Sequence, residues 1–237
     1  AGAETTLTAE ETAETIVPDY CPDMARIIDT EGMVFLHGRD FRDGKATLSG
    51  TVRVTVLYTP EGEGGIRSLE FAIPFTAESE SLPDCAYLTA EVEPEMLESR
   101  MLNPRKVFTH CKLVARVNTY QRASLRVCPD VETAPELCVE KRRERQRATL
   151  LTHMAEKDFT FSEEMNLSPG REGAAEILSS QVRGSVTETK LVGSKLLFKG
   201  VFRICLLYRT AQGQYCSTAG ELPFSQIMEV EGAQEGS

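Results

Sequence analysis

Several classes of residue and motif are missing from this sequence. It contains no tryptophan and only three histidines, and no apolar run approaches the roughly 18 residues that a transmembrane helix requires. There is no GxSxG, HExxH, phosphate-binding glycine loop or EF-hand loop, and no CxxC pair that would favour a zinc site. We therefore expect a protein without a membrane span, a metal site, a cofactor or an enzymatic activity.

The histidines are His37, His110 and His153, and they do not form a recognisable pair with a nucleophile. His110 is followed directly by Cys111 in a segment that we expect to be a strand. Neighbouring side chains of a strand point to opposite faces, so these two cannot act as a catalytic dyad. A hydrolase with an unrecognised site is therefore the least favoured of three functional hypotheses.

Acidic residues outnumber basic ones, which gives a formal net charge of -10 and a pI near 5.0. Binding to nucleic acid or to an anionic membrane needs clustered lysine and arginine, so neither is expected as a general property. Residues 141–147 are the exception, and we interpret this basic run as a solvated strand face or linker rather than a phosphate-binding patch. The 41% hydrophobic and 26% charged residues are typical of a globular protein.

A nine-residue stretch occurs twice, at Gly50–Tyr58 and, in altered form, at Gly200–Tyr208. In both copies apolar side chains alternate with polar or mixed ones, which is the period-two pattern of a half-buried strand. The apolar positions are Val52, Val54 and Val56 in the first copy and Phe202, Ile204 and Leu206 in the second. Both stretches are predicted to be core strands.

The repeat extends beyond this strand at the same offset of 150 residues. Residues 24–60 and 174–210 share seven identities, where chance would give roughly two or three. The identical positions are Ala25 and Ala175, Ile27 and Ile177, Lys45 and Lys195, Gly50 and Gly200, Arg53 and Arg203, Leu57 and Leu207, and Tyr58 and Tyr208. We interpret the chain as two copies of one module.

The spacing of strand and turn signals predicts an all-β, mainly antiparallel fold with two tandem sandwich-like modules. The second copy is expected to be incomplete, because no later segment corresponds to the strands expected at 87–97 and 107–120. The predicted divisions are an N-terminal tail or lead-in segment at 1–23, the first module at 24–123, a connector at 124–157 and the shortened second module at 158–237. Asp43-Gly44 predicts a tight hairpin turn, and residues 159–167 a strand leading into the second copy.

The N-terminal residues 1–17 are interpreted as a tail or a weak edge strand, with Leu7, Ile16 and Val17 as their strong apolar anchors. The seven cysteines are an odd number, and two interpretations remain open. They are free or buried thiols, or surface cysteines crosslink chains in an oxidising setting. The candidates for such interchain disulfides are Cys205, Cys128 and Cys138, and the repeat register places Cys205 on the face opposite the core.

Six segments in a fixed order characterise the first copy. They are Pro22–Ile28, Asp43–Lys45, Gly50–Val54 with Leu57 and Tyr58, Gly64–Phe71, Ile73–Phe75 and Leu102–Val107. This pattern resembles the SPOCS domain, which occurs in tandem in the N-terminal part of SipL-like sporulation proteins of anaerobic spore formers. The resemblance covers most of the chain, as one nearly whole copy and one shortened copy.

The resemblance implies a β-rich module that performs no chemistry and serves assembly of the spore coat or outer spore layers. SipL-like proteins also carry a C-terminal LysM domain, which this sequence lacks, so we expect a structural protein of the coat, the exosporium or an appendage. It is expected to assemble from the mother-cell cytoplasm with other spore coat proteins.

The other two functional hypotheses concern assembly and docking. In the first, the chain forms a homo-oligomer or polymer. The incomplete second copy presents unpaired backbone groups, and residues 1–17 of another chain add a strand there. Interchain disulfides then lock the polymer. In the alternative, a monomeric adaptor docks a spore coat morphogenetic protein or a surface glycan.

Overall fold

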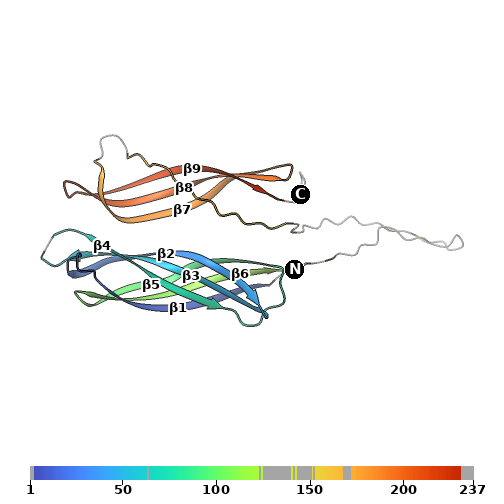
Figure 1. The fold of residues 1–237 in the computed structure, drawn as a ribbon, viewed down its shortest axis with the longest axis horizontal. Helices are drawn as coiled ribbons and strands as arrows, with labels where there is room; N and C mark the ends of the chain where they lie inside the picture. Colours follow the sequence, from blue (N-terminus) through green and yellow to red (C-terminus); the bar gives the residue numbers. More distant parts are fainter. Residues whose placement is uncertain are drawn as a thin grey trace.

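The computed structural model describes residues 3–62, 64–122, 124, 140, 142, 151, 153–167 and 172–230. Within these residues the fold is all-β and antiparallel, as the sequence predicts, with nine strands and no helix. The strands are β1 (Glu4–Ile16), β2 (Met24–Arg42), β3 (Lys45–Pro60), β4 (Arg67–Glu78), β5 (Tyr87–Asn103), β6 (Lys106–Tyr120), β7 (Ala174–Val192), β8 (Lys195–Thr210) and β9 (Tyr215–Glu229). The first six form one body and the last three lie beside it (Figure 1).

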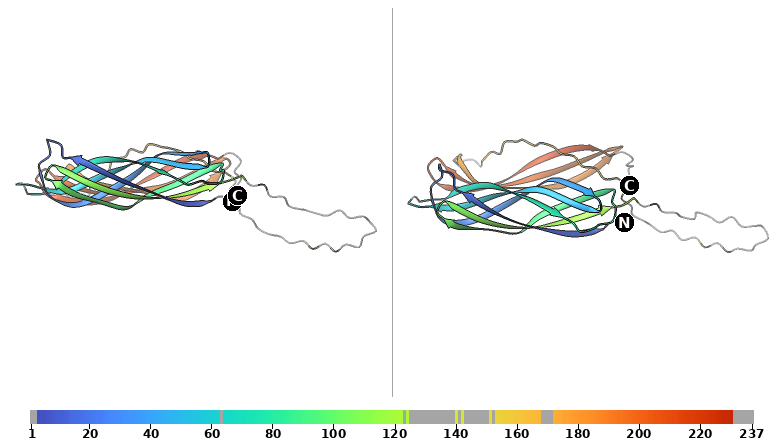
Figure 2. Two further views of the ribbon diagram at one scale, coloured as in Figure 1. Left: turned by 90° about the horizontal axis from the view of Figure 1, so that it is seen from below. Right: turned by 60° about the horizontal axis from the view of Figure 1, so that its bottom comes forward.

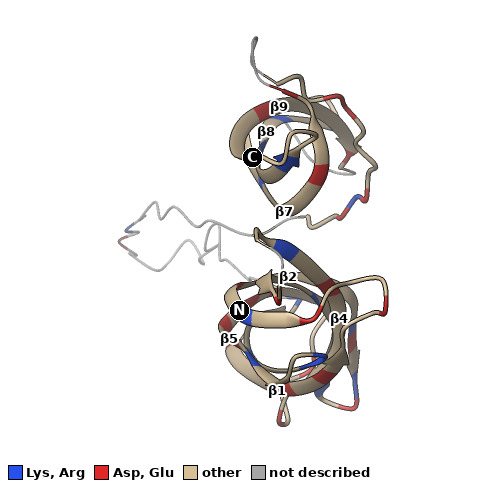
Figure 3. Cartoon of the chain, turned by 90° about the vertical axis from the view of Figure 1, so that its left-hand side faces the viewer, with Lys and Arg blue, Asp and Glu red and all other residues tan. Residues whose placement is uncertain are grey.

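The first module consists of two three-stranded sheets packed face to face. Sheet A has the strand order β1-β6-β5 and sheet B the order β2-β3-β4. Edge strand β2 lies next to β5, and β1 lies next to β4, so the two sheets meet along both edges. Seen end-on, the strands of this module surround a common core (Figure 3).

The core of the first module follows from the alternation of side chains along β3 and β6. Every second residue of β3 is buried, with Leu48, Val52, Val54 and Val56 fully inaccessible to solvent. Every second residue of β6 faces them from sheet A, namely Val107, Thr109, Cys111, Leu113, Ala115, Val117 and Thr119. Burial of these two apolar rows is the main driving force for folding of the module.

The predicted hairpin between β2 and β3 is present. Asp43 and Gly44 have positive φ values of 51° and 74°, as the two central residues of a type I′ turn require. In the corresponding turn between β7 and β8, the two central residues are Gly193 and Ser194, and only Gly193 has a positive φ. Each turn aligns the long antiparallel strands that it joins.

Residues 174–229 repeat sheet B as sheet C, with the strand order β7-β8-β9. The match extends to irregularities of the backbone: three register shifts interrupt the β2–β3 pairing, and three interrupt the β7–β8 pairing 150 residues later. Both copies also need glycine at one core position. A Cβ at Gly50 would lie 2.3 Å from the Phe35 carbonyl oxygen, and one at Gly200 would lie 2.2 Å from that of Ser185.

Sheet C lies lengthwise along the first module, with β7 next to sheet B (Figures 1 and 2). Glu31 on β2 accepts hydrogen bonds from the Ser179 hydroxyl and from the Gln181 side chain, the latter at 3.0 Å. The backbone N–H of Ile66 donates to the Tyr215 hydroxyl at 2.6 Å. These contacts between the modules are polar.

The structure decides one expectation about segments outside the repeat core and corrects another. Of the two alternatives for the N-terminal residues, a tail or a weak edge strand, residues 4–16 form the edge strand β1, which is paired along its whole length with β6. The segment 159–167 is not a strand, because none of its backbone is paired in a sheet. Its alternation of apolar residues nevertheless has a structural role, described below.

Candidate interaction surface

The inner face of sheet C is the counterpart of the core face of sheet B, but it is less deeply buried. Phe198, Phe202, Ile204 and Leu206 are all partly exposed, whereas their counterparts in β3 are fully buried. The difference has a simple cause. Sheet B is covered by the three strands of sheet A, and no described strand covers sheet C.

Segment 153–167 covers part of this face instead, running along sheet C as an irregular chain (Figure 1). The Phe159 ring centroid lies 5.7 Å from that of Phe224, and the Phe161 centroid lies 5.1 Å from that of Phe202. Met165 approaches Gly220 so closely that a Cβ there would lie 2.7 Å from its sulfur. The segment is therefore held mainly by side chains.

Lys157 anchors the same segment to β9. Its Nζ donates to the Ile227 carbonyl oxygen at 2.7 Å and to the Gln226 side-chain oxygen at 3.1 Å. Segment 153–167 thus lies on the β9 side of the sheet. This placement matches the first module, where β1 lies next to β4.

The repeat offset explains this placement, because residues 153–167 are the counterpart of residues 3–17. Because the offset of 150 is an even number, odd-numbered residues of the two segments correspond to the same face of a strand. The odd-numbered residues are buried in the first segment at Leu7, Ala9 and Val17, and partly buried in the second at Phe159, Phe161, Met165 and Leu167. The segment is therefore the β1 equivalent of the second copy. It remains unpaired because the central strand to which it would bond, the equivalent of β6, is not among the described residues.

The opposite side of sheet C, along β7, is covered by no described strand of a second sheet, although Val182 also lines a cavity against the first module. Ile177, Val182 and Val186 pair with Tyr208, Ile204 and Gly200, so they belong to the inner face. Their exposed fractions are 55%, 45% and 55%. In the first module this side is covered by β5, which contacts β2.

One end of the first module is closed by the turn between β5 and β6. Arg105 donates to the carbonyl oxygens of Val17 at 2.9 Å and Cys21 at 2.8 Å, and to the carboxylates of Asp19 and Asp23 at 3.1 and 3.0 Å. The Pro104 carbonyl accepts from the Met24 N–H at 2.9 Å. This clasp fixes the loop between β1 and β2 over the end of the core.

Tyr58 and Tyr208 occupy equivalent positions at this end of the two copies, and both are fully buried. The Tyr58 hydroxyl donates to the Pro22 carbonyl oxygen, within the clasped loop, at 3.3 Å. Burial, with a contribution from the nearby Cys21, raises the pKa of Tyr58 to about 12. The Tyr208 hydroxyl has no hydrogen-bond partner among the described residues.

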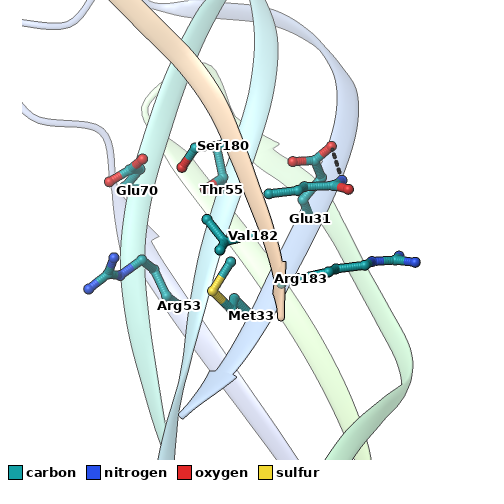
Figure 4. A pocket seen from close by; sticks show the side chains of 10 residues that line it. Glu31, Met33, Arg53, Thr55, Glu70, Ser180, Val182 and Arg183 are labelled. Carbon is teal, nitrogen blue, oxygen red and sulfur yellow. Dashed lines mark hydrogen bonds between the residues drawn. The ribbon is translucent and has the colours of Figure 1, made fainter. Parts of the chain in front are cut away.

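A polar cavity of about 300 Å³ lies between the modules, where β7 crosses the outer face of sheet B (Figure 4). It is lined by Glu31, Arg53, Glu70 and Arg183, among others. Arg53 also stacks over the Phe35 ring, with its guanidinium carbon 5.0 Å from the ring centroid. Its repeat counterpart Arg203 instead donates to Glu221 at 2.7 Å, so this shared position has a different partner in each copy.

The cysteines proposed as crosslinks fall in different places. Cys205 is exposed and pairs with Ala219 on the outer face of sheet C, as the repeat register predicts. Cys128 and Cys138 lie outside the described residues. Cys111 is buried in the first core, where desolvation raises the pKa of its thiol. The five described cysteines are all free thiols.

The proposed strand-donor anchors are used within their own chain. Leu7 and Val17 are buried in the core of the first module, whereas Ile16 is 70% exposed. Residues 4–16 pair residue by residue with β6 of their own chain, and donation of this segment to another chain stays a prediction. Among the described residues no cluster of three or more potential metal ligands occurs, and no helix could span a bilayer.

Sequence reasoning missed the parts of this surface that depend on distant contacts. Arg105 was part of a recognised motif, but its partners are 82 to 88 residues away in sequence. Phe159 and Phe161 suggested a strand by their alternation. Comparing residues 3–17 with 153–167 at the repeat offset would have revealed the segment's position.

Comparison with known families supports the repeat. The family model described as SipL, SPOCS domain matches residues 23–118 and 173–237. The two matches correspond to β2 through β6 and to β7 through β9. The curated proteins and the solved structures give no significant match.

Proposed function

Because the chain belongs to the SipL SPOCS domain family, whose role is in sporulation, we propose that it is a non-catalytic structural protein of the spore coat, exosporium or a spore appendage. It self-assembles through contacts made by its second copy. The observation that carries this proposal is the half-covered inner face of sheet C, together with the exposed apolar row on β7.

The edges of sheet C support assembly as well. Strands β7 and β9 each pair with β8 on one side only, so their other edges present unpaired backbone groups within the described residues. Exposed edges of this kind are templates for pairing with another chain. Repeated contacts that do not close into a ring produce filaments or layers.

Interchain disulfides would stabilise such an assembly. Cys205 is exposed on the outer face of sheet C, where a thiol of another chain can reach it. Replacement of Cys205 by serine is expected to remove the oxidised crosslink without loosening the fold, because this side chain is outside the core. Cys85→Ser is the matched control, since Cys85 is partly buried in the first module.

Size-exclusion chromatography with light scattering, together with negative-stain microscopy, tests the proposal. The purified chain is compared with and without reductant. Filaments or sheets that are more stable under oxidising conditions are the expected result. A monomer under both conditions would exclude self-assembly as an intrinsic property of the chain.

The alternative function is a monomeric adaptor that docks another spore coat protein. One observation favours it: no described strand covers the inner face of sheet C, so a different protein could pack against this face. An adaptor remains monomeric with or without reductant and forms a complex of fixed stoichiometry with its partner.

A further inference from the structure

We propose that the polar cavity between the modules binds a small zwitterion, namely a free α-amino acid with an aliphatic side chain. The carboxylate of the ligand binds Arg53, its ammonium group binds Glu70, and its side chain packs against Met33. This inference goes beyond the proposed assembly and does not rest on it. The charged residues of the cavity all lie on the outer faces of sheets B and C, so their placement does not depend on what covers the inner face of sheet C.

The floor of the cavity is formed by two rows of outward side chains that cross sheet B. Each row has one residue on β2, one on β3 and one on β4, paired across the strands. The rows are Glu31, Thr55 and Glu70, and Met33, Arg53 and Ala72. All of these residues except Ala72 line the cavity. The floor therefore offers a cation, a hydroxyl group, two carboxylates and an apolar side chain within two neighbouring rows.

Strand β7 lies over this floor, and its contacts engage only one of the two carboxylates. Glu31 accepts from the Ser179 hydroxyl and from the Gln181 side chain, as described above. Glu70 has no hydrogen bond or ion pair with a described residue. Figure 4 shows Glu70 and Arg53 on one side of the cavity and Glu31 on the other. The side with Arg53 and Glu70 is therefore the one that is free to bind a ligand.

The second copy shows how the position of Arg53 can be satisfied within the sheet. Its counterpart Arg203 lies opposite Glu221 and donates to that carboxylate at 2.7 Å. The residue opposite Arg53 is Ala72, whose side chain has no acceptor. The Arg53 guanidinium stacks over the Phe35 ring and makes no ion pair with a described carboxylate. Its hydrogen-bond donors thus remain available to a carboxylate from outside the chain.

The carboxylate of this face is displaced by one row between the copies. In sheet B, Glu70 lies opposite Thr55, whereas in sheet C the residue opposite Cys205 is Ala219. A guanidinium and a carboxylate thus line one side of the cavity, and no ion pair joins them. A ligand that carries one group of each sign satisfies both through charge-assisted hydrogen bonds.

Charge and size define the ligand further. Two arginines and two glutamates line the cavity, so their formal charges cancel and a neutral zwitterion is complementary to them. A volume of about 300 Å³ lies at the lower limit for ligand sites, which favours a single amino acid over a longer chain. Met33 and Val182 lie between the two charged sides (Figure 4). They offer apolar surface to an aliphatic side chain.

The test titrates the full chain with L-valine by isothermal titration calorimetry. Two probes of similar shape separate the charges: 3-methylbutanoate lacks the ammonium group, and 2-methylpropylamine lacks the carboxylate. We expect one-to-one binding of valine and roughly tenfold or weaker binding of each single-charge probe, which is the effect of losing a hydrogen bond between charged groups. Hydrogen exchange should slow in both β3 and β7 when valine is present, because the ligand lies between them.

A matched pair of variants places the ligand beside Arg53. Ala72→Glu gives Arg53 the cross-strand carboxylate that Arg203 has in the second copy, so it is expected to weaken valine binding by roughly tenfold or more. Thr76→Glu adds the same charge to the same outer face farther along β4, and valine binding is expected to stay within about twofold of the wild-type value. Both positions are exposed, so neither variant should unfold the sheet.

Substitution of the charged groups tests their roles directly. Arg53→Gln and Glu70→Gln are each expected to weaken valine binding by roughly tenfold or more. Arg203→Gln is the control, because Arg203 occupies the equivalent position in the second copy and does not line the cavity. Its effect on binding should stay within about twofold.

Three results would overturn the proposal. These are no binding of valine at millimolar concentrations, binding of either single-charge probe as tight as that of valine, and equal weakening by Ala72→Glu and Thr76→Glu. The proposed assembly is judged separately by light scattering without valine. A chain that polymerises and binds no valine refutes the ligand site alone, and a monomer that binds valine refutes the assembly alone.

Discussion

Removing one hydroxyl group should change stability in opposite directions in the two copies. Tyr58 and Tyr208 are equivalent and fully buried, but only the Tyr58 hydroxyl has a described partner, the Pro22 carbonyl at 3.3 Å. Substitution of either tyrosine by phenylalanine keeps the ring and removes the hydroxyl. The core volume is nearly unchanged, so the hydrogen-bonding state of the hydroxyl determines the result.

The magnitudes follow from these states. The Tyr58 hydrogen bond is long for an O–H donor, so its loss should destabilise the first module by about 0.5–1 kcal/mol. An unsatisfied buried hydroxyl costs about 1–3 kcal/mol, so Tyr208→Phe should stabilise sheet C by about 1–2 kcal/mol. The two effects differ by about 2 kcal/mol, equivalent to a factor of roughly thirty in an opening equilibrium.

Hydrogen exchange with peptide resolution is the appropriate measurement, because it reports the opening free energy of each sheet separately. Amides of β3 should exchange faster in Tyr58→Phe, and amides of β8 should exchange more slowly in Tyr208→Phe. Each variant serves as the control for the other. Faster exchange in β8 of Tyr208→Phe would mean that this hydroxyl has a partner, and it would refute the assignment of an unsatisfied group.

Further predictions concern the same elements. The pKa of Tyr58 is raised from 10.0 to about 12, so the unfolded chain ionises first as the pH rises. In urea titrations, the free energy of unfolding of the wild type should fall by about 2–3 kcal/mol relative to that of Tyr58→Phe between pH 10 and 12. If the difference in unfolding free energy between the two proteins stays constant over this pH range, the raised pKa of Tyr58 is contradicted. Gly200→Ala should destabilise sheet C by more than about 2 kcal/mol in a thermal unfolding assay, because the added Cβ would lie 2.2 Å from a backbone carbonyl oxygen. Gly64→Ala is the control: this position has open space around it, so the substitution should not change stability in the same assay. Arg105→Ala should expose the loop between β1 and β2 to hydrogen exchange and reduce stability by about 2–3 kcal/mol. Arg116 is more exposed, so Arg116→Ala should have little effect. Equal effects of the two substitutions would show that the clasp does not stabilise the loop.

The long central strands were predictable because their cause is local. Alternation of apolar and polar residues in Gly50–Tyr58 indicates a half-buried strand wherever it occurs, and the type I′ turn at Asp43-Gly44 depends on residues that tolerate positive φ. The offset of 150 residues identified the second copy. The position of Cys205 on the outer face followed from the same register.

Elements that depend on a distant partner were not predictable in this way. Residues 4–16 carry few large apolar side chains, so the sequence left a tail and a weak edge strand as alternatives, and only pairing with β6 shows that they form the edge strand. Segment 159–167 has the better alternation but is not a strand. A strand requires a neighbouring backbone to bond with, and the equivalent of β6 is not among the described residues.

The sequence by itself therefore determined the all-β class, the two copies, the central strands and the membership of the family. Only the tertiary structure decided which inner face is covered, because burial depends on what packs above a sheet and not on the sheet's own sequence. It decided that Arg105 closes the first copy and that Tyr208 is left without a described partner in the second. The physical reason is that local backbone preferences act over a few residues, whereas these contacts join residues far apart in the chain.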